Sequence, residues 1–278
     1  MNELILTGCM QGLILALVAF GVMVPLRLLN FADLTAEGTY PLGGAVCASL
    51  IMMGGHPIAA VVIAVIAAGL VGMATALIHL RFQVNTLLAG IILSTMLYSV
   101  NLRLMGKPNI ALFNMSLLFD SQSMMLKIVM MLTILAGLLI PLSLFLQTEF
   151  GLRIRAVGLN PEFSQRQGLS VARYTLLGLF LGNAYAGVAG ALTVQLQNYM
   201  DINMGVGIII HALAALMLGE CIVNNKTIKQ QLLAPLVGAL VYQQIQGLAI
   251  SLGLAHSDLK LLTGIIVLTI IALRGKKI

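Results

Sequence analysis

Two carboxylates stand four residues apart near the start of the chain, within apolar sequence. The polar side chains of this stretch are Asn30, Asp33, Glu37, Thr39 and Tyr40. An ionisable group in apolar surroundings must face protein or water, because burying an unpaired charge is costly. The stretch therefore predicts a polar path for a solute or a site that carries protons.

Sequence motifs of known enzyme sites are absent. The chain has no G-x-x-x-x-G-K-[ST] loop to cradle ATP phosphates, no H-E-x-x-H and no G-x-S-x-G. Its four histidines and three cysteines lack the spacing of metal ligands. We therefore predict that the chain is not an enzyme, holds no metal and binds no cofactor itself.

Composition places the chain in a membrane. Hydrophobic residues make up 60% of its 278 residues and charged residues only 9%, with a mean hydropathy of +1.04. A soluble domain needs a far more charged surface. The net charge of +6 comes from cations dispersed at the ends of apolar runs, which predicts contact with membrane lipid and no nucleic-acid partner.

Nine apolar runs are candidates for membrane-spanning helices, since about twenty apolar residues cross a bilayer and lipid cannot satisfy free backbone groups. They are residues 4–24, 34–53, 57–79, 86–104, 126–147, 173–195, 205–223, 231–252 and 259–274. The sequence thus predicts an all-α integral membrane protein: a polytopic bundle of about nine transmembrane helices (eight to ten) that forms a single transmembrane domain, residues 1–278.

The cations predict the orientation, because inner loops of membrane proteins are enriched in Lys and Arg. With the N-terminus outside and the C-terminus cytoplasmic, eleven of the 15 cations fall inside and four outside. The inner set is Arg27, Arg81, Arg153, Arg155, Arg166, Arg173, Lys226, Lys229, Arg274, Lys276 and Lys277, and the outer set is Arg103, Lys107, Lys127 and Lys260. This bias places the loop 148–173 in the cytoplasm.

The two carboxylates have two interpretations of equal weight in such a protein. In one, both border a solute path. In the other, Asp33 lies at the headgroup level beside Arg27, and only Glu37 is immersed. Asn183 and His211, which also stand in apolar runs, are predicted to join the substrate path.

Polar side chains also recur in the run 86–104. They are Asn85, Thr86, Ser94, Thr95 and Asn101. Their face either lines a path or hydrogen-bonds a neighbouring helix, and the second interpretation is preferred.

Small residues recur at every fourth position of the run 173–195. They are Gly178, Gly182, Ala186 and Gly190. Residues four apart share one helix face, so this spacing predicts a groove into which another helix packs closely. Asn183 adjoins the groove and needs a polar neighbour there.

The loop 148–173 is the longest polar and basic interval of the chain. Asn160 is predicted to cap a short helix that begins at Pro161, where a missing N–H costs nothing. Gly168 supplies a left-handed end. The helix, of about two turns, carries Phe163 as its bulky apolar side chain, which predicts a small element offered to a partner.

The sequence of this loop resembles that of the loop by which the permeases of branched-chain amino acid and ribose ABC importers contact their ATPase. The family pattern is a Gly, an Arg-Ala pair, Gly-x-Asn-Pro and a closing Gly. It is matched by Gly151, Arg155, Ala156, Gly158, Asn160, Pro161 and Gly168. The stretches Asn30-Phe31-Ala32 and 210–219 are similar to further family segments, although Glu220 replaces the second Gly of a Leu-Gly-Gly turn.

This resemblance implies a permease subunit of an ABC importer in the bacterial cytoplasmic (inner) membrane, moving a small polar solute for which we expect an amino acid. ATP and Mg would bind to partner ABC ATPase subunits. A second permease copy and a periplasmic or lipid-anchored substrate-binding protein would complete the importer. The residues expected to contact the ATPase are Arg155, Gly158, Asn160, Pro161, Glu162, Phe163, Gln165, Arg166 and Gly168.

Two other functions are consistent with the residues alone. In an ion-coupled secondary transporter, Asp33, Glu37 and His211 would relay protons and Pro141 would form a gate. In a membrane scaffold, the basic loop would only recruit a soluble partner. Neither function requires an ATPase.

Overall fold

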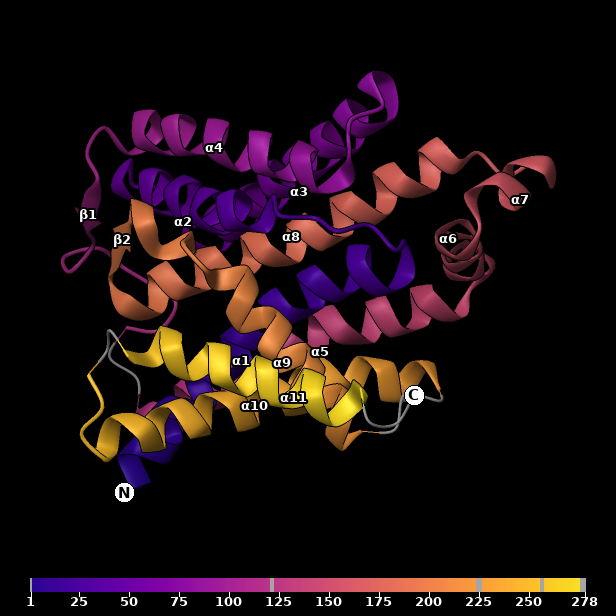
Figure 1. Ribbon diagram of the computed structural model, residues 1–278. Coiled ribbons are helices and arrows are strands. Elements are labelled where there is room, and N and C mark those ends of the chain that lie inside the picture. Colours follow the sequence, from indigo (N-terminus) through magenta and orange to yellow (C-terminus); the bar gives the residue numbers. More distant parts are fainter. Residues whose placement is uncertain (1, 121–122, 224–226, 256–257, 276–278) are drawn as a thin grey trace. The chain divides into compact units, whose positions relative to one another are not determined.

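The computed structural model describes residues 2–120, 123–223, 227–255 and 258–275, and most of them are helical (Figure 1). The helices are α1 (Asn2–Met23), the π-helical turn η1 (Val24–Leu28), α2 (Ala36–Met52), α3 (Pro57–Phe82), α4 (Thr86–Met105), α5 (Met124–Gln147), α6 (Glu149–Leu159), α7 (Pro161–Arg166), α8 (Val171–Gln197), the 3-10 turn η2 (Ile202–Gly205), α9 (Ile208–Ile222), α10 (Ile228–Ser251) and α11 (Leu259–Gly275). Two short strands, β1 (Asn109–Ala111) and β2 (Tyr199–Asp201), complete the elements. Three of the predicted inner cations, Lys226, Lys276 and Lys277, lie outside the described residues.

Each predicted span coincides with a helix to within about one turn. Within the described ranges, seven helices are long and apolar enough to cross a membrane. Helix α2 has 17 residues, and α11 contributes a shorter apolar run, Leu259–Ile270. The all-α polytopic class is therefore confirmed, whereas the count of nine spans and their orientation stay predictions.

Local side-chain chemistry sets several helix ends. At the start of α3, the His56 ring accepts a hydrogen bond from the Ile58 N–H, 3.3 Å away, and Pro57 occupies the first helical position. At the start of α4, Asn85 Oδ1 accepts from the Leu87 N–H at 2.9 Å. Gly106 ends α4 in the left-handed conformation, with φ of 70°.

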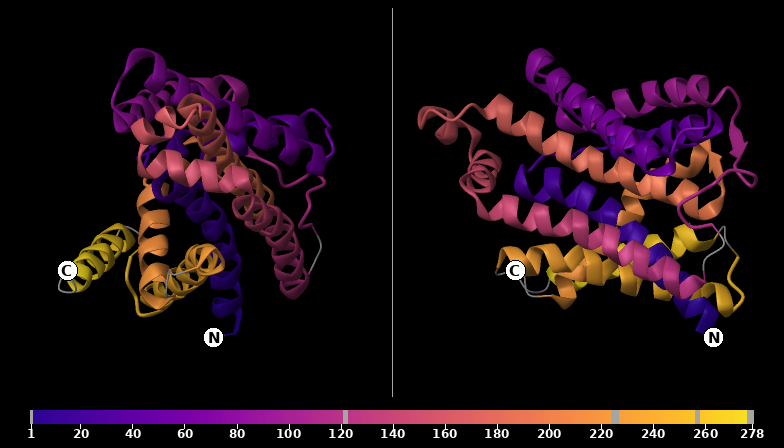
Figure 2. Two further views of the ribbon diagram at one scale, coloured as in Figure 1. Left: turned by 90° about the vertical axis from the view of Figure 1, so that its right-hand side faces the viewer. Right: turned by 180° about the vertical axis from the view of Figure 1, so that it is seen from behind.

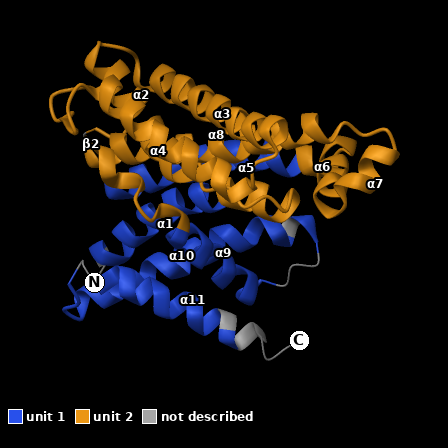
Figure 3. Cartoon of the chain, turned by 45° about the horizontal axis from the view of Figure 1, so that its top comes forward, with its two compact units in different colours: residues 1–19, 122–144, 210–278 blue, residues 20–121, 145–209 orange. Residues whose placement is uncertain are grey.

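The chain forms two compact units (Figure 3). The first unit comprises residues 1–19, 122–144 and 210–278, and the second comprises residues 20–121 and 145–209. In the first unit, α9 and α10 are in close contact at Gly219 and Gly238. A Cβ on Gly238 would lie 2.8 Å from Gly219 Cα.

Helix α8 is the centre of the second unit and packs against α2 and α3. Its residues from Gly182 to Gln195 are all buried. A Cβ on Gly182 would lie 2.7 Å from the Gly21 carbonyl oxygen, and one on Gly190 would collide with the Tyr40 carbonyl. Ala186 is fully buried between them, and Gly178 lies against the Leu29 side chain, so all four small residues of this face are in close contact.

The two strands connect the ends of α4 and α8. They pair antiparallel, with Asn109 opposite Asp201, Ile110 opposite Met200 and Ala111 opposite Tyr199. Two further backbone hydrogen bonds flank the ladder, from Leu112 to Asn198 and from Ile202 to Pro108. Helices α6 and α7 lie at the opposite end of this unit, as the rear view shows (Figure 2).

Candidate functional site

Helix α7 is fixed at its start by its own sequence. Asn160 Oδ1 accepts a hydrogen bond from the Phe163 N–H at 2.9 Å, and Pro161 is the first helical residue. This cap satisfies a backbone N–H that would otherwise lack a partner at the start of the helix. Glu162 follows in the first turn, where the helix dipole favours a carboxylate.

The end of α7 is a Schellman motif. The Leu169 N–H donates to the Ser164 carbonyl and the Gly168 N–H to the Gln165 carbonyl, both at 3.0 Å. Gly168 adopts φ of 81°, which a residue with a side chain rarely adopts. The six residues of α7 thus lie between a side-chain cap at the start and two backbone hydrogen bonds at the end.

Phe163 is the large apolar residue on the exposed side of α7, and it is 59% exposed. Gln165 and Arg166 are also exposed, whereas Ser164 is only 2% exposed and faces the protein. A probe that cross-links α7 to a partner protein should therefore be attached at Gln165 and not at Ser164.

Helix α6 was not predicted, although its periodicity is present in the sequence. Its buried residues are Gly151, Ile154, Val157 and Gly158, which recur at helical spacing. Two intervening arginines made the segment resemble a polar loop. The helix also brings Leu159, 88% exposed, to the residue before the Asn160 cap, so a second apolar side chain accompanies Phe163.

Gly158 and Arg155 anchor α6 within the second unit. Gly158 lies against the backbone of Leu28 and Leu29, close enough that a Cβ would be 2.7 Å from Leu29 Cα. The Arg155 guanidinium donates to the carbonyls of Leu146, at 3.0 Å, and Gly151, at 3.2 Å. Both predicted contact residues thus hold the helix in place.

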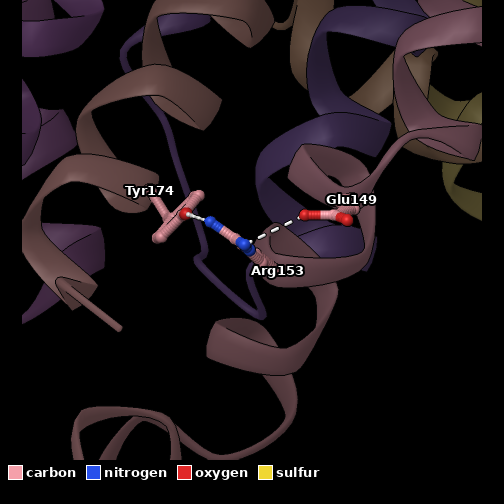
Figure 4. A network of polar contacts seen from close by, with 3 residues as sticks. All are labelled: Glu149, Arg153 and Tyr174. Carbon is pink, nitrogen blue, oxygen red and sulfur yellow. Dashed lines mark hydrogen bonds and ion pairs between the residues drawn. The ribbon is translucent and has the colours of Figure 1, made fainter. Parts of the chain in front are cut away.

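Arg153 joins α6 to the first turn of α8 (Figure 4). Its guanidinium lies 3.0 Å from Glu149 Oε2 and donates to the Tyr174 hydroxyl at 3.5 Å. The hydrogen bond to Tyr174, with a smaller contribution from Glu149, raises the pKa of Arg153 above its usual value. The guanidinium therefore stays charged at every physiological pH.

Asp33 lies in a buried hydrogen-bond network. Its Oδ2 accepts from Asn183 Nδ2 at 2.7 Å, and its Oδ1 accepts from the Thr35 N–H at 2.8 Å. Asn183 Oδ1 in turn accepts from the Thr39 hydroxyl at 2.8 Å. The polar neighbour that Asn183 needs is therefore Asp33, which is 8% exposed.

Tyr40 and Asn30, also predicted for the path, are not in this network. The buried Tyr40 hydroxyl pairs with Thr193 Oγ1 at 2.8 Å. Asn30 is exposed and takes φ of 51° between η1 and the segment that leads to α2. Their assignment to a solute path stays a prediction.

Glu37 lies apart from the network, in the wall of a cavity of about 400 Å³ within the second unit. The cavity is lined by Glu37, Gly38, Pro41, Ser94, Thr95, Tyr98, Asn101, Ile202, Gly205 and Val206. Its walls are thus α2, α4 and the segment around η2. The structure brings Glu37 together with the polar face of α4, which sequence reasoning had assigned to packing.

His211 belongs to the first unit and has polar partners of its own. Its Nδ1 lies 2.6 Å from the Tyr242 hydroxyl, which also contacts Thr263 Oγ1 at 2.6 Å and accepts from Gln246 at 2.7 Å. These four side chains form a cluster between α9, α10 and α11.

Comparisons with known proteins agree on one family. The family model described as the branched-chain amino acid transport system permease component matches residues 4–272. A tyrosine transport system permease protein of Clostridioides difficile (strain R20291) is 32% identical over 262 residues, 94% of this chain and 88% of the relative. An uncharacterized protein of Rickettsia prowazekii (strain Madrid E) is 31% identical over 268 residues, 95% of each chain.

A more distant similarity extends over part of the chain. A nucleoside ABC transporter permease protein of Lactococcus lactis subsp. cremoris (strain MG1363) is 31% identical over 147 residues, 52% of this chain and 38% of the relative. No solved structure matches the chain. The family match over residues 4–272, together with the apolar helices, makes this chain a multi-pass protein of the inner membrane and a member of the branched-chain amino acid transport system permease family.

Proposed function

We propose that this chain is the transmembrane subunit of an ABC importer that moves an amino acid into the cytoplasm. The observation that carries the proposal is α7, capped at both ends and presenting an exposed Phe163 beside an exposed Leu159. Exposed aromatic and aliphatic side chains on a rigid element are typical anchors of a protein interface. In a member of this permease family, the partner that fits is the ATPase.

The anchoring of α6 supports a mechanical role for this element. A force on α7 passes through Asn160 into α6, whose Gly158 lies against the backbone of Leu28 and Leu29. Backbone contacts at such short range transmit a displacement with little loss, because no flexible side chain lies between them. ATP hydrolysis on the partner would thereby move η1 and the segment that follows it.

An amino acid is the proposed solute. A relative that aligns over 88% of its length is named a tyrosine transport system permease protein, whereas the nucleoside permease aligns over 38% of its length. The proposal includes nine spans with the N-terminus outside and the C-terminus inside, a second copy of the permease and a binding protein that delivers the solute. ATP and Mg bind to the ATPase, and this chain binds no cofactor.

Reconstitution tests the proposal. The chain is expressed with the genes that neighbour it, purified with the proteins that bind to it, and placed in liposomes for uptake of a panel of radiolabelled amino acids. We expect uptake only when ATP is present inside the liposomes, on the side of the ATPase, and the binding protein is present outside. Uptake driven by a proton gradient without ATP would contradict the importer, and uptake of nucleosides but no amino acid would contradict the solute class.

A further inference from the structure

The cavity beside Glu37 has an unusual balance of hydrogen-bonding groups. Its charged group is the Glu37 carboxylate, which accepts a hydrogen bond from the Gly207 backbone and is partly exposed. No lysine, arginine or histidine is present in the described lining. A carboxylate in a membrane-embedded wall without a cation beside it requires water or a positively charged ligand.

A second acceptor in the same wall lacks a partner. The Asn101 side chain is 1% exposed, and its Nδ2 donates to the Gly38 carbonyl at 3.4 Å. Its Oδ1 is buried and has no hydrogen-bond partner within the described structure. A buried carbonyl without a donor is uncommon, and it indicates that the missing donor arrives from elsewhere.

Two hydroxyl groups of the cavity, those of Ser94 and Thr95, are acceptors too, whereas the third, that of Tyr98, can both donate and accept. Ser94 Oγ donates its hydrogen to the Ile91 carbonyl at 3.0 Å, and Thr95 Oγ1 donates to the Ile92 carbonyl at 2.8 Å. A hydroxyl has one hydrogen, so only the lone pairs of these two oxygens remain available. The cavity thus offers Glu37, Asn101, Ser94 and Thr95 as acceptors.

The ligand group that matches these four acceptors carries several donors and a positive charge. A primary ammonium group has three N–H donors and no lone pair. Sugars and nucleosides are poorer matches, because a neutral ligand leaves the Glu37 carboxylate without a counter-charge. The volume of about 400 Å³ falls within the usual range of small-molecule sites, roughly 300–1,000 Å³.

We propose that this cavity is a subsite of the solute path that binds the ammonium group of the transported amino acid between Glu37 and Asn101. Tyr98, 49% exposed in the same wall, places an aromatic ring beside the bound group. The inference rests on the proposed function only in identifying the ammonium group as that of an amino acid.

Cysteine protection in the assembled complex tests the subsite. Thr95→Cys is introduced into a chain in which Cys9 and Cys221 are replaced by Ser, while Cys47, fully buried, is retained. Its reaction with N-ethylmaleimide is timed in the presence of L-tyrosine, tyramine or 3-(4-hydroxyphenyl)propionate. The last probe keeps the phenol and carboxylate but lacks the amine.

We expect L-tyrosine and tyramine to slow labelling about tenfold at saturation and the propionate to leave it unchanged. Glu37→Gln should raise the half-protecting concentration about tenfold or more, since it removes a charge-assisted hydrogen bond. Asn101→Leu, a second variant, removes the unpartnered acceptor together with the 3.4 Å hydrogen bond to the Gly38 carbonyl, and it should raise the half-protecting concentration severalfold. Glu3→Gln, the same change at an exposed position in the first turn of α1, should have no effect.

Protection by the propionate, protection that persists in Glu37→Gln, or no protection by any probe would overturn the subsite. ATP-dependent uptake in liposomes of the same complex separates this outcome from failure of the proposed function. Uptake of an amino acid without protection refutes the subsite alone. Protection by the amines without amino-acid uptake refutes the importer's solute class and leaves an ammonium site in place.

Discussion

Two polar regions that begin within five residues of each other differ in whether their hydrogen bonds are satisfied. Around Asp33, the network with Asn183 and Thr39 is buried, and both carboxylate oxygens have donors. Around Glu37, the cavity contains Asn101 Oδ1, to which the described part of the chain provides no donor. The difference indicates that the first carboxylate holds helices together, whereas the second is available to a ligand.

The largest effect is expected from breaking the closed network. Asn183→Leu removes the donor to Asp33 Oδ2 and the acceptor of the Thr39 hydroxyl, so a buried carboxylate loses a partner. We expect a loss of about 3 kcal/mol or more in folding free energy, measured as a lower melting temperature in detergent.

Asn101→Leu is the matched control for this change. It makes the same substitution on α4 but removes an oxygen to which the described residues provide no donor and one long hydrogen bond, 3.4 Å, to the Gly38 carbonyl, so the loss of folding free energy should be much smaller. Equal destabilisation by the two variants would show that the two regions do not differ as described.

A somewhat smaller effect is expected from the packing that holds Asn183 in place. Gly182→Ala puts a methyl group 2.7 Å from the Gly21 carbonyl oxygen and 2.8 Å from Pro25, both of which belong to the backbone or a rigid ring. We expect a cost of about 1–3 kcal/mol in thermal unfolding. In α5, a Cβ on Gly137 would have no described atom within 4 Å, so Gly137→Ala should cost nothing. A loss of stability of similar size in Gly137→Ala would refute the role of the Gly182–Gly21 contact.

The next largest effect is expected on binding of the ATPase to α7, where the residue that matters is exposed and not buried. Phe163→Ala should weaken binding of the ATPase by about 2 kcal/mol and uncouple ATP hydrolysis from solute, while the permease stays folded. Arg166→Ala, a change at the rim, should be mild. Cross-linking from Gln165→Cys to a co-purified ATPase provides the direct measurement, and its absence in an active complex would place docking elsewhere.

The smallest effect on stability is expected at Glu37. Glu37→Gln should leave the melting temperature unchanged and reduce uptake, because the carboxylate faces the cavity and has a single protein donor among the described contacts. Asp33→Asn should instead lower the melting temperature. The new amide group would place a donor against the Thr35 N–H or the Asn183 Nδ2, which are donors themselves. Unchanged uptake in Glu37→Gln would remove its role in the path.

Local features of the chain were predictable from sequence. The ends of α7 depend on Asn160, Pro161 and Gly168, each of which acts on backbone groups within a few residues. The spans were also predictable, because about twenty apolar residues have few alternatives to a helix in lipid.

Features that depend on distant residues were not predictable in the same way. Sequence indicated that Asn183 needs a polar neighbour, but the neighbour, Asp33, is 150 residues away. Likewise, Thr39 and Glu37 both belong to α2, and only the helices around it determine that one meets Asn183 and the other meets α4. Periodicity cannot separate the two faces of a helix that is covered on both.

The strand ladder between Asn109–Ala111 and Tyr199–Asp201 gives the second unit a pivot. It prevents α4 and α8 from sliding past one another at that end, since sliding would break its hydrogen bonds. Helix α8, with 27 residues, extends about 40 Å from this pivot, and α7 adjoins its far end. A displacement of α7 would therefore rotate α8 slightly about the strand ladder. The cavity wall would move with this rotation, because it includes Ile202, directly after the ladder.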